Sequence, residues 1–204
     1  MPESVAGGRP GPAMTQLQPL PYSAYPAYVA AAAAAYAQEK LDAGHWPAAT
    51  ALERARDEFA ALLPLGLATP QQYLFQLLPS SQGPVVGWLW LALETTAGEG
   101  NGDRSDDGDR DRSGDGDCDG DSDGSGSGSA DGGRYSGFNY DLRILPEYRR
   151  RGHAGRALQA VELLARTLGA NSLALQVFAN NPAALALYRQ QGYRVSSLNM
   201  DKHW

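Results

Sequence analysis

A basic turn that contains glycine is the part of this sequence whose residue types best suit binding chemistry. It runs from Pro146 to Arg156, between an expected strand and an expected amphipathic helix. The small residues, which let a ligand approach the backbone closely, are Gly152, Ala154 and Gly155. The arginines, which are forked donors for phosphate oxygens, are Arg149, Arg150, Arg151 and Arg156. Because a helix N-terminus adds unpaired N–H groups and partial positive charge, the turn predicts a phosphate site; solvated arginines at a helix start are the alternative.

A second group of polar residues flanks a short helix later in the chain. Asn181 is expected to cap a helix over residues 182–190, and Gly192 is expected to end it. Tyr188 lies near the end of that helix and carries a phenol, which can donate a proton. On its own, such a tyrosine is typical of a half-buried packing residue.

The expected elements form one α/β domain over residues 21–204, after a flexible tail over residues 1–20 that is rich in Pro and Gly. Apolar spacing predicts helices over residues 22–43, 47–63, 154–168 and 182–190. Runs of β-forming residues predict strands over residues 72–78, 84–93, 138–145, 172–178 and 193–202. This order predicts a three-layer αβα arrangement with helices on both faces of a sheet.

Residues 97–137 are low in complexity and are expected to be a disordered insertion between two strands. Eleven Asp and three Arg within residues 101–133 sum to -8, whereas the whole chain carries -6, so the remainder carries about +2. No basic patch for nucleic acid and no membrane-binding face is evident. A single cysteine and the lack of an apolar leader favour a cytoplasmic protein.

The two motifs together resemble the two signatures of the GNAT superfamily of N-acetyltransferases. The turn matches the pattern Arg/Gln-x-x-Gly-x-Gly/Ala through Arg149, Gly152 and Ala154. The segment from Asn181 to Tyr193 matches Asn-x-x-Ala-x-x-Leu-Tyr-x-x-x-Gly-Phe/Tyr. The resemblance is strong after residue 138 and weak before residue 84. It implies a GNAT-like αβα fold with a central mixed, mostly antiparallel sheet.

The resemblance also implies a co-substrate, acetyl-CoA, and no metal. In that family, amides of the turn bind the pyrophosphate, and backbone groups of the preceding strand pair with the pantetheine arm. The residues expected to bind the cofactor are therefore Leu142, Arg143, Ile144, Arg149, Arg150, Arg151, Gly152, His153, Ala154, Gly155, Arg156 and Asn181. His153 stands where the family has an apolar or aromatic residue, so it is expected to pack rather than to act as a base.

The chemistry that the resemblance implies is direct transfer of an acetyl group to a primary amine. Tyr188 matches the family tyrosine near the thioester sulfur, where a phenol can protonate the departing thiolate. Asp141 is the second catalytic candidate, as a base or as a partner for a cationic amine; an ordinary strand-end carboxylate is its alternative. Tyr140 and Glu94 are further candidates for the base. The acceptor is expected to be a small-molecule or peptide amine, and a homodimer is left open.

Two other functions stay open at this point. The insertion contains Asp115, Asp117, Asp119 and Gly120 in the order that begins a calcium-binding EF-hand loop. However, Gly126 stands where that loop needs a glutamate, which favours a solvated acidic linker. The second alternative is a non-catalytic module that binds or senses acyl-CoA on the same fold.

Overall fold

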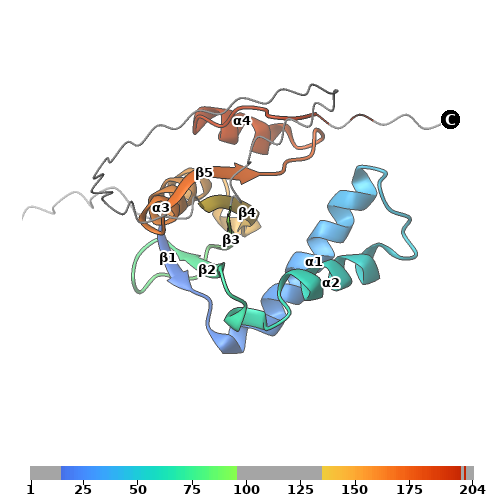
Figure 1. Ribbon diagram of the computed structural model, residues 1–204, viewed down its shortest axis with the longest axis horizontal. Coiled ribbons are helices and arrows are strands. Elements are labelled where there is room, and N and C mark those ends of the chain that lie inside the picture. Colours follow the sequence, from blue (N-terminus) through green and yellow to red (C-terminus); the bar gives the residue numbers. More distant parts are fainter. Residues whose placement is uncertain (1–14, 96–134, 199, 201–204) are drawn as a thin grey trace, which may run out of the picture.

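A five-stranded sheet forms the centre of the computed structural model, which describes residues 15–95, 135–198 and 200 (Figure 1). Its strands lie in chain order: β1 Gln16–Pro19, β2 Gln72–Leu78, β3 Gly87–Thr95, β4 Tyr135–Ile144 and β5 Ala170–Leu175. The first three junctions are antiparallel, and the β4–β5 junction is parallel. The expected mixed, mostly antiparallel sheet is therefore confirmed.

Helices cover both faces of this sheet, as the order of elements predicts. They are α1 Tyr25–Asp42, α2 Ala51–Leu62, α3 His153–Thr167 and α4 Pro182–Gln190, with 3-10 turns at Tyr22–Ala24, Gly66–Ala68 and Pro146–Tyr148. The alternation of β3 divides the core, because successive strand residues point to opposite faces. Trp90 packs with α1 and α2, whereas Leu89 and Leu91 pack beneath α3. Figure 1 shows α1 and α2 side by side, away from α3.

Local sequence explains the helices. Alanine, the strongest helix former, dominates α1. An apolar stripe on α3, formed by Ala157, Leu158, Val161 and Ala165, is buried against the sheet. The side chain of Asn181 caps α4, since its Oδ1 accepts a hydrogen bond of 3.1 Å from the N–H of Ala184. The bounds predicted for α4 are confirmed.

Two expectations about the chain ends are wrong. Gln16–Pro19 is not part of a tail but an edge strand, paired with β2 from Gln16↔Leu78 to Pro19↔Phe75. A strand of four residues leaves too short a pattern to be recognised within a segment that is rich in Pro and Gly. No strand forms over residues 193–198 or at residue 200, where Leu198 and Met200 are 81% and 92% exposed. Residues 1–14, 199 and 201–204 lie outside the described residues.

The acidic insertion joins two neighbouring antiparallel strands. Thr95 at the end of β3 pairs with Tyr135 at the start of β4, so residues 135–137 belong to the sheet rather than to the insertion. The rest of the expected insertion, including the calcium-loop candidate at residues 115–120, lies outside the described residues. Within the part of the chain that is described, no helix is long and apolar enough to cross a membrane.

Candidate functional site

The turn before α3 has the backbone geometry of an anion site. Gly152 adopts a left-handed φ of 78°, and a Cβ there would lie 2.7 Å from Nη1 of Arg156, so only glycine fits without strain. Arg150 also has a positive φ, of 60°, which is uncommon for a residue with a side chain. The first backbone bond of α3 runs from Arg156 N to Gly152 O. The preceding N–H groups, of His153, Ala154 and Gly155, therefore have no partner within the helix.

A pocket of about 420 Å³ opens between this turn and α4. On one side it is lined by Ile144, Tyr148, Arg149, Arg150, Gly152, His153, Ala154 and Gly155. On the other side it is lined by Ala183, Ala184, Leu187 and Gln190 of α4. The pocket thus combines a cationic end, which suits phosphate, with an apolar wall. The α4 residues are absent from the sequence-based set, although their spacing places them on one helix face.

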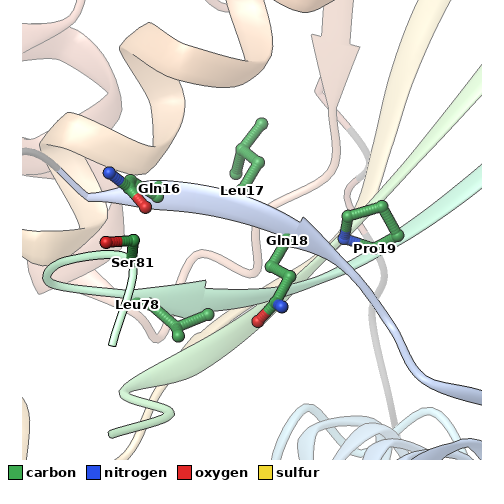
Figure 2. Close-up of a pocket in the computed structure, with 6 residues that line it drawn as sticks. All are labelled: Gln16, Leu17, Gln18, Pro19, Leu78 and Ser81. Carbon is green, nitrogen blue, oxygen red and sulfur yellow. The ribbon is translucent and has the colours of Figure 1, made fainter. Parts of the chain in front are cut away.

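A second pocket, of about 190 Å³, lies beside β1 and β2 (Figure 2). Gln16, Leu17, Gln18, Pro19, Leu78 and Ser81 line it. None of these side chains is ionisable, and β1 stands at the opposite edge of the sheet from β5. We therefore take the larger pocket, with its free amides and arginines, as the candidate site.

The four arginines of the turn fall into two groups by their contacts. Arg149 and Arg150 line the pocket, and Nε of Arg149 also donates to the carbonyl of Ile144 at 3.1 Å. Arg151 lies over the ring of Tyr148, with its Cζ 5.6 Å from the ring centroid. Nη2 of Arg156 donates to the carbonyl of Arg151 at 2.9 Å. Arg151 and Arg156 thus brace the turn, whereas Arg149 and Arg150 face the space where a ligand would lie.

His153 is buried, being 7% exposed, and belongs to a small polar network. Its Nδ1 lies 3.2 Å from Oγ1 of Thr15 and 3.3 Å from Nη2 of Arg156. Nε of Arg156 donates to the same hydroxyl at 3.2 Å. Burial, then the charges of Arg156 and Arg151, lower the pKa of His153 below its ordinary value. A neutral, buried imidazole fits the expected packing role.

A β-bulge interrupts β4 beside the site. Trp90 pairs with Asp141 and Leu91 pairs with Asn139, so Tyr140 is an extra residue without a partner on β3. The ladder between β4 and β5 ends at Asn139↔Leu175. Residues 140–144 of β4 therefore lie beyond the parallel ladder, with backbone groups on that side free of β5. These residues include the three, Leu142, Arg143 and Ile144, expected to pair with a ligand; among them Ile144 lines the pocket and Leu142 packs into the core.

The bulge lets two consecutive residues face the same helix. Tyr140 stacks on Trp90, with ring centroids 4.7 Å apart, in the core under α1 and α2. Asp141 accepts a hydrogen bond of 3.2 Å from the hydroxyl of Tyr28 in α1. Arg143 forms a salt bridge of 3.5 Å with Asp141 and donates to the carbonyl of Ala31. Burial raises the pKa of Asp141, while Arg143 and Tyr28 oppose this rise.

Of the other base candidates, Tyr140 and Glu94 form a pair. Burial, followed by the nearby Glu94 carboxylate, raises the pKa of Tyr140. Glu94 is exposed and pairs with Ser136, toward the far end of β4 from Ile144. Glu94 therefore lies farther from the turn along the sheet than Asp141 does.

Tyr188 is half-buried on α4, one residue after the pocket-lining Leu187. Burial, then the carboxylates of Asp141 and Glu39, raise the pKa of Tyr188 to about 12, so its hydroxyl stays protonated at neutral pH. Glu39 is a residue that sequence reasoning missed. Its own pKa is raised by partial loss of hydration, against the effect of Arg143, and then by Asp141. The sequence feature that could have identified Glu39 is its position in the helix, three turns after Tyr28 and therefore on the same helix face.

Comparisons with known proteins agree with this geometry. The model of the acetyltransferase (GNAT) family matches residues 119–193, which include the turn, α3 and α4. The uncharacterized N-acetyltransferase YycN of Bacillus subtilis is 28% identical over 186 residues, covering 91% of this chain and 96% of that protein. The part of the chain that carries the turn, α3 and α4 thus matches the GNAT family. A crystal structure of the putative acetyltransferase YycN from Bacillus subtilis superposes on this protein with a TM-score of 0.72 at 28% sequence identity, covering 93% of this chain and 98% of the other.

A second relative extends the comparison. The uncharacterized N-acetyltransferase YdgE of Bacillus subtilis is 25% identical to this protein over 167 residues, covering 82% of this chain and 83% of the relative. The match to the GNAT family model and the similarity to these relatives support acyl transfer as the class of reaction. It also agrees with the fold that the two sequence motifs imply.

Proposed function

We propose that this protein transfers an acetyl group from acetyl-CoA directly to a primary amine. One observation carries the proposal: the pocket runs from the phosphate-suited turn to α4, the helix that also carries Tyr188. A ligand with a phosphate at one end would therefore place its other end toward a protonated phenol. Acetyl-CoA has this layout, with a diphosphate, a long arm and a reactive thioester.

Each end of the pocket has a chemistry that suits one part of acetyl-CoA. The free N–H groups of His153, Ala154 and Gly155, with Arg149 and Arg150, would bind the diphosphate. The backbone of residues 142–144 would pair with the amides of the arm, since β5 does not extend that far. Asn181 lies outside the pocket lining and would act by holding α4, whose apolar residues form the facing wall.

The α1 side of the site carries the groups that suit the amine. An amine reaches the site mainly as an ammonium ion and must lose a proton before its nitrogen can attack the thioester carbonyl. Asp141 and Glu39 both have a raised pKa and both act electrostatically on Tyr188. We assign these carboxylates to attracting the cation and accepting its proton, with exposed Glu39 passing the proton to solvent.

Tyr188 is assigned to the leaving group. When the C–S bond breaks, its electron pair stays on sulfur. A simple thiol has a pKa of about 8.5, so full proton transfer from a phenol of pKa about 12 is uphill by roughly 3.5 in pKa, or about 5 kcal/mol. Tyr188 therefore stabilises the developing thiolate as a hydrogen-bond donor rather than by losing its proton completely.

An acetyl-CoA turnover screen tests the proposal. The protein is incubated with acetyl-CoA and a panel of small-molecule amines and peptides, and released thiol is measured against time. We expect release that depends on the amine and an acetylated product in the mass spectrum. Tight binding of CoA by calorimetry, with no acetylated product from any amine, would instead identify the non-catalytic acyl-CoA sensor.

A further inference from the structure

Three aromatic rings surround the ammonium group of Lys40. Its Nζ lies 5.2 Å from the ring centroid of Tyr36, 5.4 Å from that of Trp46 and 5.5 Å from that of Phe178. Tyr36 and Trp46 meet edge to face at 5.5 Å, which makes a corner. Each of these distances is within the range in which an aromatic ring attracts a cation. We call Tyr36, Trp46 and Phe178 the aromatic cage.

The cage is assembled from parts of the chain that are far apart in sequence. Tyr36 and Lys40 lie one turn apart on α1, and Trp46 follows in the connection to α2. Phe178 comes from the segment between β5 and α4. All four side chains are half-buried, so the cage is neither sealed in the core nor spread on the surface. It spans from the helix that carries Glu39 to the segment that leads into the helix of Tyr188.

Charges around the cage favour a cation. Glu39 precedes Lys40 in the chain and interacts electrostatically with Asp141 and Tyr188 of the proposed transfer site. Burial, then the carboxylates of Glu58 and Glu39, raise the pKa of Tyr36. Within the described residues, Lys40 forms no salt bridge, so the rings are its close partners. An aromatic enclosure with two carboxylates nearby is chemically suited to an alkylammonium group.

We propose that the aromatic cage is a subsite for a second ammonium group of the acceptor, and that Lys40 fills the cage when no acceptor is bound. The inference rests on the proposed function and narrows its substrate class to amines with two or more cationic groups, such as linear diamines. One nitrogen would be acetylated near Tyr188 and Asp141, while the other replaces the Lys40 ammonium among the three rings. Lys40 thus competes with the substrate for its own subsite.

The first test compares diaminobutane with butylamine, which has the same carbon chain and one charge. Trp46→Leu is expected to raise the KM for diaminobutane about tenfold and to leave that for butylamine within about twofold. Lys40→Met, which removes the ammonium group from the cage, is expected to lower the KM for diaminobutane. Lys40→Arg keeps a cation there and is expected to give no such gain. His45→Ala is the matched control, because the His45 ring packs on Phe178, with ring centroids 5.8 Å apart, but is not one of the three rings recorded around Lys40.

The double variant Lys40→Met/Trp46→Leu separates the cage from general charge effects. If the cage binds the cation, the gain from Lys40→Met disappears when Trp46 is also replaced. If Lys40→Met acts only by removing positive charge, the gain persists in the double variant, and the inference is wrong. Equal changes in KM for the two amines would also overturn it.

A binding measurement that needs no turnover keeps the two proposals distinguishable. Tetramethylammonium is titrated into Lys40→Met, and the indole N–H signal of Trp46 is followed by NMR, assigned by its loss in Trp46→Phe. A saturable shift supports the cage, and no shift at any concentration overturns it, whether or not an amine is acetylated. Acetylation of butylamine and diaminobutane with the same efficiency would leave the transfer activity standing and remove only the subsite.

Discussion

The hydroxyl of Thr15 lies 3.2 Å from Nδ1 of His153 and thereby ties the start of the sheet to the first turn of α3. Arg156 donates to the same hydroxyl and to the carbonyl of Arg151. A residue ahead of β1 is thus part of the support for the turn that would bind the diphosphate. The left-handed backbone of Gly152 leaves room for that arginine, so the network and the turn depend on one another.

Replacing Thr15 by valine tests this support. Thr15→Val keeps the shape of the side chain but removes the oxygen that accepts from Arg156, and leaves buried polar atoms unpaired. We expect the Kd for CoA to rise several-fold, with little change in the KM for the amine. Thr50→Ala is the control, because the buried Oγ1 of Thr50 has no hydrogen-bond partner among the described residues. Equal CoA affinity in both variants would count against a supporting role.

The lowered pKa of His153 predicts a loss of stability in mild acid. Because folding depresses this pKa, the unfolded chain binds more protons as pH falls below about 6.5. The contribution is present above that pH and is lost as pH falls toward the folded-state value. We expect the free energy of unfolding, measured by urea titration at a series of pH values, to fall more steeply there in the parent than in His153→Gln. Parallel curves would show that His153 does not titrate differently on folding.

Gly152→Ala separates backbone strain from ligand binding. A left-handed φ costs an alanine roughly 1–2 kcal/mol, and its Cβ would also displace Arg156. Gly44 has nearly the same φ, 74°, with nothing within 4 Å of a Cβ, so Gly44→Ala carries the strain without the collision. We expect both variants to lose stability in thermal unfolding, but only Gly152→Ala to weaken CoA binding in calorimetry.

Tyr188→Phe removes the hydroxyl assigned to the leaving thiolate. We expect kcat to fall on the order of a hundredfold, with the KM for acetyl-CoA nearly unchanged. Tyr193→Phe is a matched control. The ring centroids of Tyr193 and Tyr188 lie 5.7 Å apart, and burial likewise raises the pKa of Tyr193 to about 12. With its pKa at about 12, Tyr188 should cause no loss of activity between neutral pH and about pH 10. Unchanged turnover in Tyr188→Phe would assign the residue to packing.

Asp141→Asn tests the carboxylate on the α1 side. Protonated Asp141 cannot accept a proton, so kcat/KM for the amine should rise as pH increases through its raised pKa. Asparagine can still accept the hydrogen bond from the Tyr28 hydroxyl, but it never becomes charged. The variant should therefore have lower activity, and its kcat/KM should no longer rise through this pH range. The measurement is kcat/KM between acid and neutral pH, with Glu39→Gln alongside. A parent-like profile in Asp141→Asn would move the base assignment to Glu39.

The parts of the fold that the sequence predicts correctly are those governed by neighbouring residues. The helix from Pro182 to Gln190 has its cap at Asn181 and a glycine at residue 192, and its bounds are confirmed. The turn at residues 149–156 has its glycine and arginines in a local pattern. Helix α2 begins four residues later than expected, at Ala51.

The features that sequence reasoning missed depend on partners far along the chain. The short strand β1 exists because Gln16 and Leu17 meet Leu78 and Leu77 of β2. Glu39 becomes part of the candidate site only because α1 packs against β4. The strand over residues 193–202 was expected from its β-forming residues. Its described residues pair with no strand of the sheet, and β-forming residues alone do not provide a partner.

Tyr140 is an addition to an otherwise regular ladder. Deleting it would leave every other pair between β3 and β4 in place, because Asn139 and Asp141 would then be consecutive residues on opposite faces, as their partners Leu91 and Trp90 already are. The face toward α1 would lose the ring that stacks on Trp90, whereas Asp141 and Arg143 would keep their places. Evolution could therefore remove this aromatic side chain from β4 without disturbing the carboxylate beside it.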